Sequence, residues 1–179
     1  MNGESGHLET VGSVVRALAD LGLTPVLVGG MALVVLGSRR VTRDFDFVVG
    51  RPEDRPASLL DVLYDRGLEL VSRLSAEGDV TATIDNRRVA GTRLRLDAPA
   101  SASFYDPRTG LRIDLLFDYP LEARALAGRA TTVRVRSLAL RVASEDDLLR
   151  LKRIALEERT RATDAGDVAF LEARRGTRA

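Results

Sequence analysis

The spacing of hydrophobic residues changes along the chain, and each spacing predicts a different element. Between residues 9 and 21 the apolar positions recur every three or four residues, which predicts a helix with one buried face and a stop at Gly22. A short apolar run then ends at Gly29 and Gly30, and residues 31–37 return to a helical spacing. The pattern predicts a strand, a glycine turn and a short helix in that order.

Residues 44–49, with the sequence DFDFVV, alternate acidic and aromatic side chains before a short apolar end. In a strand, every second side chain points to the same face. Asp44 and Asp46 are therefore expected on one face, while Phe45 and Phe47 point to the core on the other. A largely apolar strand that carries a pair of acids on one face calls for a chemical reason.

The next part of the chain, residues 52–66, is predicted to be helical up to a stop at Gly67, and a meander of strands follows. The predicted strands are residues 68–74, 79–84, 88–96, 102–106 and 111–117, with the hairpin turn DPRTG between the last two. In the last strand, Asp114 shares a face with Arg112 and Leu116, while the apolar side chains between them point to the other face. Asp114 is thus a third acid in a strand.

The C-terminal third is predicted to contain a strand pair near residues 131–143 and then helices. Ser144, with Asp147 as the third residue after it, has the spacing of a capping box, with Asp in place of the commoner Glu. The last helix is expected at residues 163–173, before a basic, frayed tail.

The composition fits a single globular domain over residues 1–179, since 45% of the residues are hydrophobic and 30% are charged. We expect its core at about 24–119, and the C-terminal strand pair and helices at about 120–173. The chain shows neither a signal-peptide pattern nor an apolar stretch long enough to span a membrane, so we expect a cytoplasmic location.

The charges and the rare residue types exclude several classes of protein. The 27 basic and 26 acidic side chains nearly cancel, which argues against strong binding of duplex DNA. The chain has no cysteine, and its one histidine, His7, is expected in a polar N-terminal tail. Thiolate metal sites, cysteine nucleophiles, histidine-based zinc sites and Ser/His/Asp triads are therefore disfavoured. Catalysis would depend on carboxylates.

The paired acids suit a hard cation. Two carboxylates on one strand face lie roughly 6 to 7 Å apart at the backbone, and their side chains can converge on one Mg²⁺ ion, which relieves their repulsion. Two-metal sites for nucleotidyl transfer need a further carboxylate, for which Asp114 is the candidate. A D-x-D strand alone is more often a surface feature. The combination with Asp114 and the glycine pair favours a site for two Mg²⁺ ions.

Gly29 and Gly30 would form a turn at which backbone N–H groups can approach a triphosphate without a Cβ in the way. Arg39, Arg40 and Arg43 lie beside the acids and could neutralise phosphate oxygens, although most arginines of so arginine-rich a chain are expected to be solvated. A dinucleotide-binding interpretation fails because the G-x-G-x-x-G fingerprint is not formed.

The order of these features resembles the DNA polymerase beta-like nucleotidyltransferase superfamily, and within it the minimal bacterial AbiEii-type branch. The likeness consists of the apolar strand, the glycine pair, the segment R-x-T-x-D-x-D at residues 40–46 and the later R-I-D that ends in Asp114. The resemblance implies an α+β fold with a mixed sheet flanked by helices, and metal binding by Asp44, Asp46 and Asp114. It also implies a set of nucleotide-binding residues, which are Gly29, Gly30, Arg40, Thr42 and Lys152.

The C-terminal part adds to the resemblance. The branch has a tail of the form ED-L-x-x-L-K-x-x-A … R-x-x-D-x-x-D-x-x-x-L, and the chain has Lys152, Arg161, Asp164 and Asp167 at the matching positions. N-terminal capping and a salt bridge with Arg161 would explain Asp164 and Asp167 almost as well as a role in the site. One departure is Met31 after the glycine pair, where the superfamily usually has Ser or another small residue.

The resemblance implies transfer of a nucleoside monophosphate from an NTP to an acceptor hydroxyl, with Mg²⁺ as cofactor and with the third carboxylate able to act as general base. We expect a toxin-like enzyme with a macromolecular acceptor such as tRNA, and a cognate antitoxin as a candidate partner. Related families modify a partner protein or an aminoglycoside, and the near-neutral charge does not separate these acceptors. The competing hypothesis is a nucleotide-binding or antitoxin-like module without catalysis. The presence of all three acids favours the enzyme.

Overall fold

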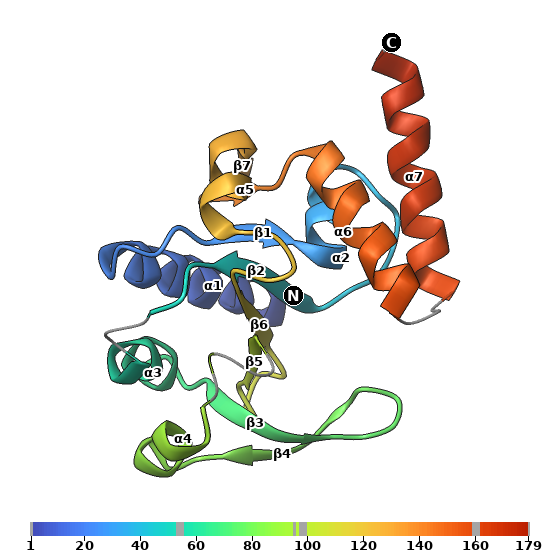
Figure 1. Cartoon of the computed structure of the whole chain (residues 1–179). Helices are drawn as coiled ribbons and strands as arrows, with labels where there is room; N and C mark the ends of the chain where they lie inside the picture. Colours follow the sequence, from blue (N-terminus) through green and yellow to red (C-terminus); the bar gives the residue numbers. More distant parts are fainter. Residues whose placement is uncertain (1, 53–55, 95, 97–99, 159–161, 179) are drawn as a thin grey trace.

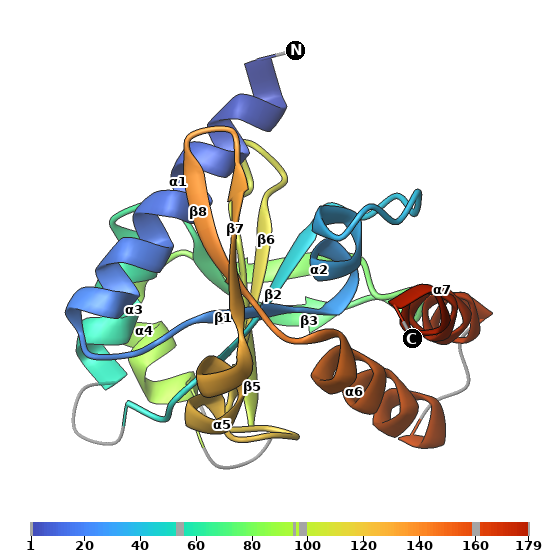
Figure 2. The same ribbon diagram turned by 90° about the horizontal axis from the view of Figure 1, so that it is seen from above.

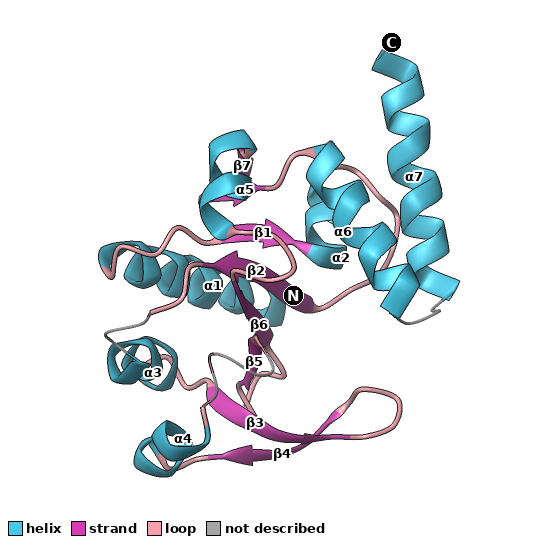
Figure 3. Ribbon diagram, viewed as in Figure 1, coloured by secondary structure: helices cyan, strands magenta, loops and turns pink. Residues whose placement is uncertain are grey.

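A computed structural model describes residues 2–52, 56–94, 96, 100–158 and 162–178 of the chain. These residues form seven helices and eight strands (Figure 1 and Figure 3). The helices are α1 (Asn2–Asp20), α2 (Gly29–Val35), α3 (Pro56–Tyr64), α4 (Arg87–Arg93), α5 (Ala123–Arg129), α6 (Glu145–Glu158) and α7 (Ala162–Arg178). The strands are β1 (Val26–Val28), β2 (Asp44–Val49), β3 (Glu69–Leu74), β4 (Val80–Ile84), β5 (Ser101–Tyr105), β6 (Arg112–Phe117), β7 (Thr131–Val135) and β8 (Leu138–Val142).

The eight strands form one mixed sheet with the order β4-β3-β5-β6-β2-β1-β8-β7. β2 pairs in parallel with β6, and β1 with β8, while the other neighbours are antiparallel. β2 therefore lies in the interior of the sheet, hydrogen-bonded along both edges by β1 and β6. The mixed sheet flanked by helices confirms the predicted α+β fold.

The helices divide between the two faces of the sheet. In Figure 2, α1 and α3 lie on one side of the strands, and α2, α6 and α7 lie on the other. Phe45 and Phe47 of β2 and Ile113 and Leu115 of β6 are at most 4% exposed. Full burial of such a side chain contributes ~1.5–3 kcal/mol, so these residues fix which face of each strand packs into the core. The acids that alternate with them must point to the opposite face, toward α2 and α6.

The strand predicted at residues 88–96 is wrong over residues 88–94, and residue 95 lies outside the described residues. Residues 87–93 are helical instead, because Asn86 caps α4: its side-chain oxygen accepts hydrogen bonds from the N–H groups of Arg88 and Val89 at 3.0 and 3.2 Å. Ala90 of this helix is fully buried. The strand was predicted from the β-branched residues of this segment. The capping signal of Asn86 outweighs their preference and starts a helix.

The N-terminal helix is longer than predicted, since α1 begins at Asn2 rather than at residue 9. His7 therefore lies in a helix and not in a polar tail. Its Nε2 lies 3.0 Å from the carbonyl oxygen of Thr109, so it contacts the turn between β5 and β6. Within the described part of the chain, no helix combines the length and the apolar character that a membrane span requires.

The C-terminal helix also exceeds its prediction, because α7 continues to Arg178 and residues 174–178 are helical rather than frayed. Arg174 ties this end of α7 to the rest of the protein. Its Nη1 donates a hydrogen bond to the carbonyl oxygen of Leu36 at 2.8 Å, and its Nη2 lies 3.0 Å from Glu145 Oε1. These long-range contacts have no counterpart in the local pattern on which the prediction of a frayed tail depended.

The start of α6 has the predicted interaction between Ser144 and Asp147. The N–H of Asp147 donates to Ser144 Oγ at 3.2 Å, and the Ser144 hydroxyl donates to the Asp147 carboxylate at 2.8 Å. Arg129 donates to both oxygens of the same carboxylate, at 2.8 and 2.9 Å. Burial would raise the pKa of Asp147, but the hydrogen bonds from Arg129 and Ser144 hold it below its ordinary value of 3.8. This cluster fixes the first turn of α6.

We expect Asp147→Asn to lower the free energy of unfolding at neutral pH, and the loss to shrink in acid. A carboxylate with a depressed pKa in the fold contributes stability above its unfolded pKa of about 3.9, and that stability is lost as the pH falls through the folded value. Urea unfolding of both proteins at about pH 7 and about pH 3 measures the effect. Asp146→Asn, at the exposed neighbour, is the control. A loss of equal size at both pH values would contradict the prediction.

Candidate active site

The register between β2 and β6 brings the three predicted acids together. The two strands are parallel, Asp46 is the direct partner of Asp114, and Asp44 is the partner of Arg112. Partnered positions on neighbouring strands project to the same face of a sheet. Asp44, Asp46 and Asp114 therefore share one face in the interior of the sheet, although Asp114 lies far from the other two in sequence.

A pocket of about 470 Å³ opens over these acids. It is bounded by the sheet, by α2 and α6, and by the loop between β3 and β4. The residues predicted to form the site all line this pocket, and they are Gly29, Gly30, Arg40, Thr42, Asp44, Asp46, Asp114 and Lys152. The fold thus brings separate segments of the chain to one cavity, while the role of each residue stays a prediction.

The glycine pair makes room for two charged side chains of the pocket. Gly29 has a φ of +66°, which glycine adopts far more readily than other residues, and a Cβ at this position would lie 2.1 Å from Asp46 Oδ2. A Cβ on Gly30 would lie 2.8 Å from the guanidinium carbon of Arg40. Both distances are too short for real contacts. The glycines therefore have a steric role in addition to the phosphate contact that the sequence predicts.

Burial disfavours the charged forms of Asp44 and Asp46. Burial raises the pKa of Asp46 to about 7, the carboxylates of Asp114 and Asp44 add to this shift, and Lys152 and Arg112 oppose it. Burial also raises the pKa of Asp44, with Arg112 acting in the opposite direction. A cation bound between the acids would favour their charged forms.

Arg112 links these acids to the loop between β3 and β4. Its Nε donates to Asp114 Oδ1 at 2.9 Å, and its Nη1 donates to the carbonyl oxygen of Gly78 at 3.0 Å. Glu77 and Asp79 of the same loop also line the pocket. The sequence placed Arg112 on the face of Asp114 but gave no sign of the loop, because the two segments meet only through the order of strands in the sheet.

The donor chemistry of the acids fits a divalent cation, since Mg²⁺ takes carboxylate oxygens as ligands. The lack of a Cβ at Gly29 leaves the room that the Asp46 carboxylate occupies beside the pocket. In the observed side-chain positions Asp114 contacts Arg112, and no group of three Asp, Glu, His or Cys side chains in the described ranges is arranged to hold a metal ion. Metal binding by the three acids is thus supported by ligand type and by their common face, and it stays a prediction.

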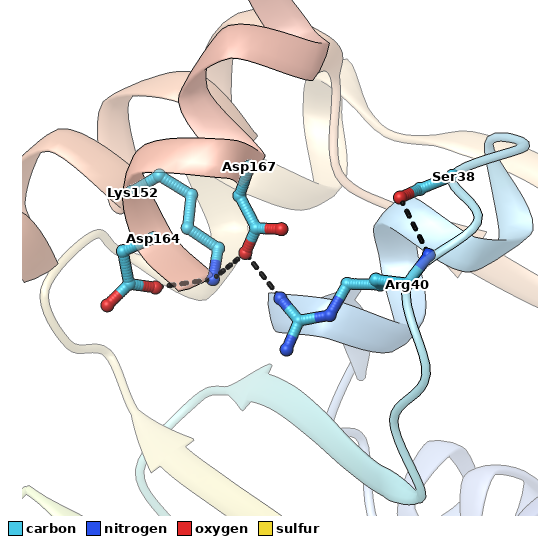
Figure 4. A network of polar contacts seen from close by, with 5 residues as sticks. All are labelled: Ser38, Arg40, Lys152, Asp164 and Asp167. Carbon is cyan, nitrogen blue, oxygen red and sulfur yellow. Dashed lines mark hydrogen bonds and ion pairs between the residues drawn. The ribbon is translucent and has the colours of Figure 1, made fainter. Parts of the chain in front are cut away.

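Carboxylates of α7 join two of the predicted nucleotide-binding residues (Figure 4). Lys152 Nζ lies 3.0 Å from Asp164 Oδ1 and 2.7 Å from Asp167 Oδ2, and the guanidinium of Arg40 pairs with the same oxygen of Asp167. Asp164 lines the pocket, whereas Asp167 is 4% exposed and is not part of the pocket lining. The sequence offered a salt bridge with Arg161 for these acids, and Arg161 lies outside the described residues.

The chain matches a protein-family model over residues 14–179. The family is described as "Nucleotidyl transferase AbiEii toxin, Type IV TA system". The match includes all of the pocket residues named above. No curated protein matches the chain.

Solved structures share the fold at low sequence identity. An antigenic nucleotidyltransferase-like protein from Paracoccidioides brasiliensis is 19% identical with a TM-score of 0.57, over 92% of this chain and 75% of that one. ANT(2'')-Ia in complex with adenylyl-2''-tobramycin is 12% identical with a TM-score of 0.60, over 96% and 90%. The lincosamide antibiotic adenylyltransferase LnuA, bound to lincomycin, is 12% identical with a TM-score of 0.55, over 92% and 95%. At such identities the likeness establishes the fold.

Proposed function

The chain belongs to the AbiEii family of nucleotidyl transferase toxins, and we propose that it transfers a nucleoside monophosphate from an NTP to a hydroxyl group of an acceptor. In this proposal the acceptor is a macromolecule such as tRNA, the reaction depends on Mg²⁺, and pyrophosphate is released. The observation that carries the proposal is the in-register pair of Asp46 and Asp114 on parallel strands, with Asp44 on the same face and Gly29 and Gly30, the first residues of α2, in the pocket lining.

Asp44, Asp46 and Asp114 are the residues that would hold Mg²⁺, and two ions are expected. When bound, Mg²⁺ supplies charge neutralisation for the phosphate oxygens. The chain contributes carboxylate ligands from two interior strands, whose hydrogen-bonded neighbours fix the spacing of the ligands. We also assign to Asp114 the acceptance of the proton from the acceptor hydroxyl, a role for which its carboxylate faces the pocket.

The remaining pocket residues are proposed to bind the NTP. Arg40 and Lys152 are partly buried cations that can contact phosphate oxygens, while the backbone of Gly29 and Gly30 and the hydroxyl of Thr42 can add hydrogen bonds. A cavity of about 470 Å³ lies within the range of ~300–1,000 Å³ that is typical of small-molecule sites. The pocket can therefore enclose a nucleotide, and a macromolecule would present its hydroxyl from outside.

A small cationic acceptor is a second candidate, and the loop between β3 and β4 favours it. Glu77 and Asp79 add carboxylates to the pocket that would repel an RNA backbone and attract amines. Two solved structures with this fold contain antibiotic ligands, adenylyl-2''-tobramycin in ANT(2'')-Ia and lincomycin in LnuA. An aminoglycoside-like compound is therefore the alternative acceptor.

The proposal is tested by incubating the protein with each NTP, radiolabelled at the α-phosphate, together with Mg²⁺ and either total tRNA or an aminoglycoside. Label in tRNA supports the toxin-like enzyme, and label in the antibiotic supports the second acceptor. Chelation of Mg²⁺ with EDTA should abolish transfer in both cases, because the proposed site depends on a divalent cation. Metal-independent NTP binding without transfer to any acceptor would instead identify a nucleotide-binding or antitoxin-like module.

We also propose a cognate antitoxin as protein partner, and the cytoplasm, where NTPs and tRNA are available, as the location. Family membership supports the partner. Expression of the protein alone and together with the product of each adjacent reading frame tests this proposal. Growth arrest that an adjacent product relieves supports it, and unchanged growth in every combination argues against a toxin.

A further inference from the structure

We propose that Asp167 of α7 is a positioning residue that holds Arg40 and Lys152 in place for the triphosphate of the NTP. This inference rests on the proposed function. Arg40 lies in the connection between α2 and β2, and Lys152 lies on α6, so one carboxylate joins three segments of the chain (Figure 4). Arg40 and Asp167 are 127 positions apart in sequence, and only the fold brings them together.

The burial of Asp167 indicates that it acts through Arg40 and Lys152 and does not contact a ligand itself. It is 4% exposed and does not line the pocket, whereas both of its cationic partners do. A ligand in the pocket would contact Arg40 and Lys152 and leave Asp167 behind them. Asp164 differs in this respect, because it lines the pocket itself.

A carboxylate shared by Arg40 and Lys152 reduces the electrostatic repulsion between these two cations. Two cations that converge on one phosphate chain repel each other before the ligand arrives, and each long side chain loses rotamer freedom when it is held in place. Asp167 lies against both cations, so it compensates their repulsion and restricts their positions at once. Its own charge is shielded from the pocket by the same two cations.

In the part of the chain that the structure describes, the contacts with α7 leave donors of Lys152 and Arg40 available for a ligand. Lys152 has three N–H donors, of which Asp164 and Asp167 engage two. The Nη1 of Arg40 pairs with Asp167, while its Nε and Nη2 lie against Gly30, each 3.0 Å from the position that a Cβ there would take. Within the described residues these two donors of Arg40 are unengaged, and they lie next to the glycine pair at the start of α2, which is proposed to bind phosphate through its backbone.

The test is the binding of inorganic tripolyphosphate with Mg²⁺, measured by calorimetry, because this probe is independent of the unknown base. Asp167→Asn keeps the shape of the side chain and removes the charge. It should weaken tripolyphosphate binding about tenfold or more, equivalent to ~1.4 kcal/mol or more. In an Arg40→Met/Lys152→Met background the same substitution should change the affinity by less than about twofold, since the groups through which it acts are absent.

Glu172→Gln is the matched control. Arg153 and Glu172 form another ion pair between α6 and α7, at 2.8 Å, but both side chains are more than half exposed and neither lines the pocket. If Asp167 only attached α7 to α6, the two substitutions would have similar effects. We expect Glu172→Gln to leave tripolyphosphate affinity unchanged, and thermal melting of every variant shows whether it is folded.

Unchanged or tighter binding by folded Asp167→Asn protein would overturn the inference. The carboxylate would then either have no effect on phosphate binding or compete with phosphate for the two cations. Failure of the wild type to bind tripolyphosphate would overturn it as well. If Asp167→Asn does not fold, Asp167→Glu is the second test of the inference. Its longer side chain should displace both cations and weaken tripolyphosphate binding. Wild-type affinity in that variant would therefore refute the inference. Tripolyphosphate binding that depends on Asp167 in a protein without nucleotidyl transfer would refute the proposed reaction alone.

Discussion

Replacement of Asp46 by Asn should lower the rate of nucleotidyl transfer on the order of a thousandfold, which corresponds to ~4 kcal/mol of transition-state stabilisation. Asp46 is the register partner of Asp114 on β6. It lies on the same strand, β2, and on the same face as Asp44. Its carboxylate lines the pocket and occupies the space that a Cβ on Gly29 would take. An amide keeps this shape but lacks the charge that binds a divalent cation.

The same substitution should raise the melting temperature of the metal-free protein. Burial raises the pKa of Asp46 to about 7, with Asp114 and Asp44 adding to the shift, so the charged form is disfavoured in the fold. The stability that a raised pKa contributes is fully present below the unfolded pKa of about 3.9, and it is lost as the pH rises through the folded value. Asn avoids this loss, so the variant should exceed the wild type in stability at neutral and alkaline pH and match it in acid.

Transfer assays with Mg²⁺ and thermal melting in EDTA at several pH values measure the two effects. Asp146→Asn is the control, because Asp146 is an exposed aspartate outside the pocket. It should change neither quantity. Retention of more than about a tenth of the wild-type rate by Asp46→Asn would contradict the metal-binding role, for which a loss on the order of a thousandfold is expected.

Gly29→Ala should reduce transfer about a hundredfold, because displacement of a reacting group by about 1 Å can have an effect of this size. The new Cβ would lie 2.1 Å from Asp46 Oδ2 and 2.7 Å from its Cγ, so the carboxylate must move. The residue would also adopt a left-handed conformation, which costs ~1–2 kcal/mol. We therefore expect losses of both activity and stability.

Gly22→Ala separates the two contributions to this effect. Gly22 has a similarly positive φ of +81°, but an added Cβ would meet no atom within 4 Å. It should therefore reproduce the backbone strain without moving a carboxylate. Urea unfolding and transfer rates of both variants give the comparison. If Gly29→Ala reduced transfer no more than Gly22→Ala does, the contact between Gly29 and Asp46 would have no part in catalysis.

The sequence predicted those parts of the fold and site that depend on local pattern. The alternation of acids and phenylalanines in residues 44–49 was sufficient to assign a strand, its core face and the common face of Asp44 and Asp46. The glycine pair marked the end of β1 for a similar reason, but α2 begins at Gly29 itself, so the predicted separate turn before a helix at residues 31–37 is wrong. A period of two residues or a change of backbone conformation can be recognised from neighbours alone.

Contacts that depend on the order of the strands, or on the packing of a helix from a distant part of the chain, could not be predicted from the sequence. Asp114 could be proposed as a third acid, but only the parallel pairing of β2 with β6 makes it the partner of Asp46. The contact of Arg112 with Gly78 follows from the same sheet order. Asp167 was noticed as one of two acids on a helix, and its pairing with Arg40 required the packing of α7 beside the pocket.

The alternation of acidic and apolar residues in β2 and β6 makes correct strand register necessary for both the core and the candidate active site. A slip of either strand by one residue would turn its acids toward α1 and α3, and its large apolar side chains toward the pocket, α2 and α6. An unpaired carboxylate among those apolar groups would cost several kcal/mol, a large part of the ~5–15 kcal/mol by which a domain of this kind is stable. A misregistered molecule would therefore unfold before it could persist as an inactive but intact product.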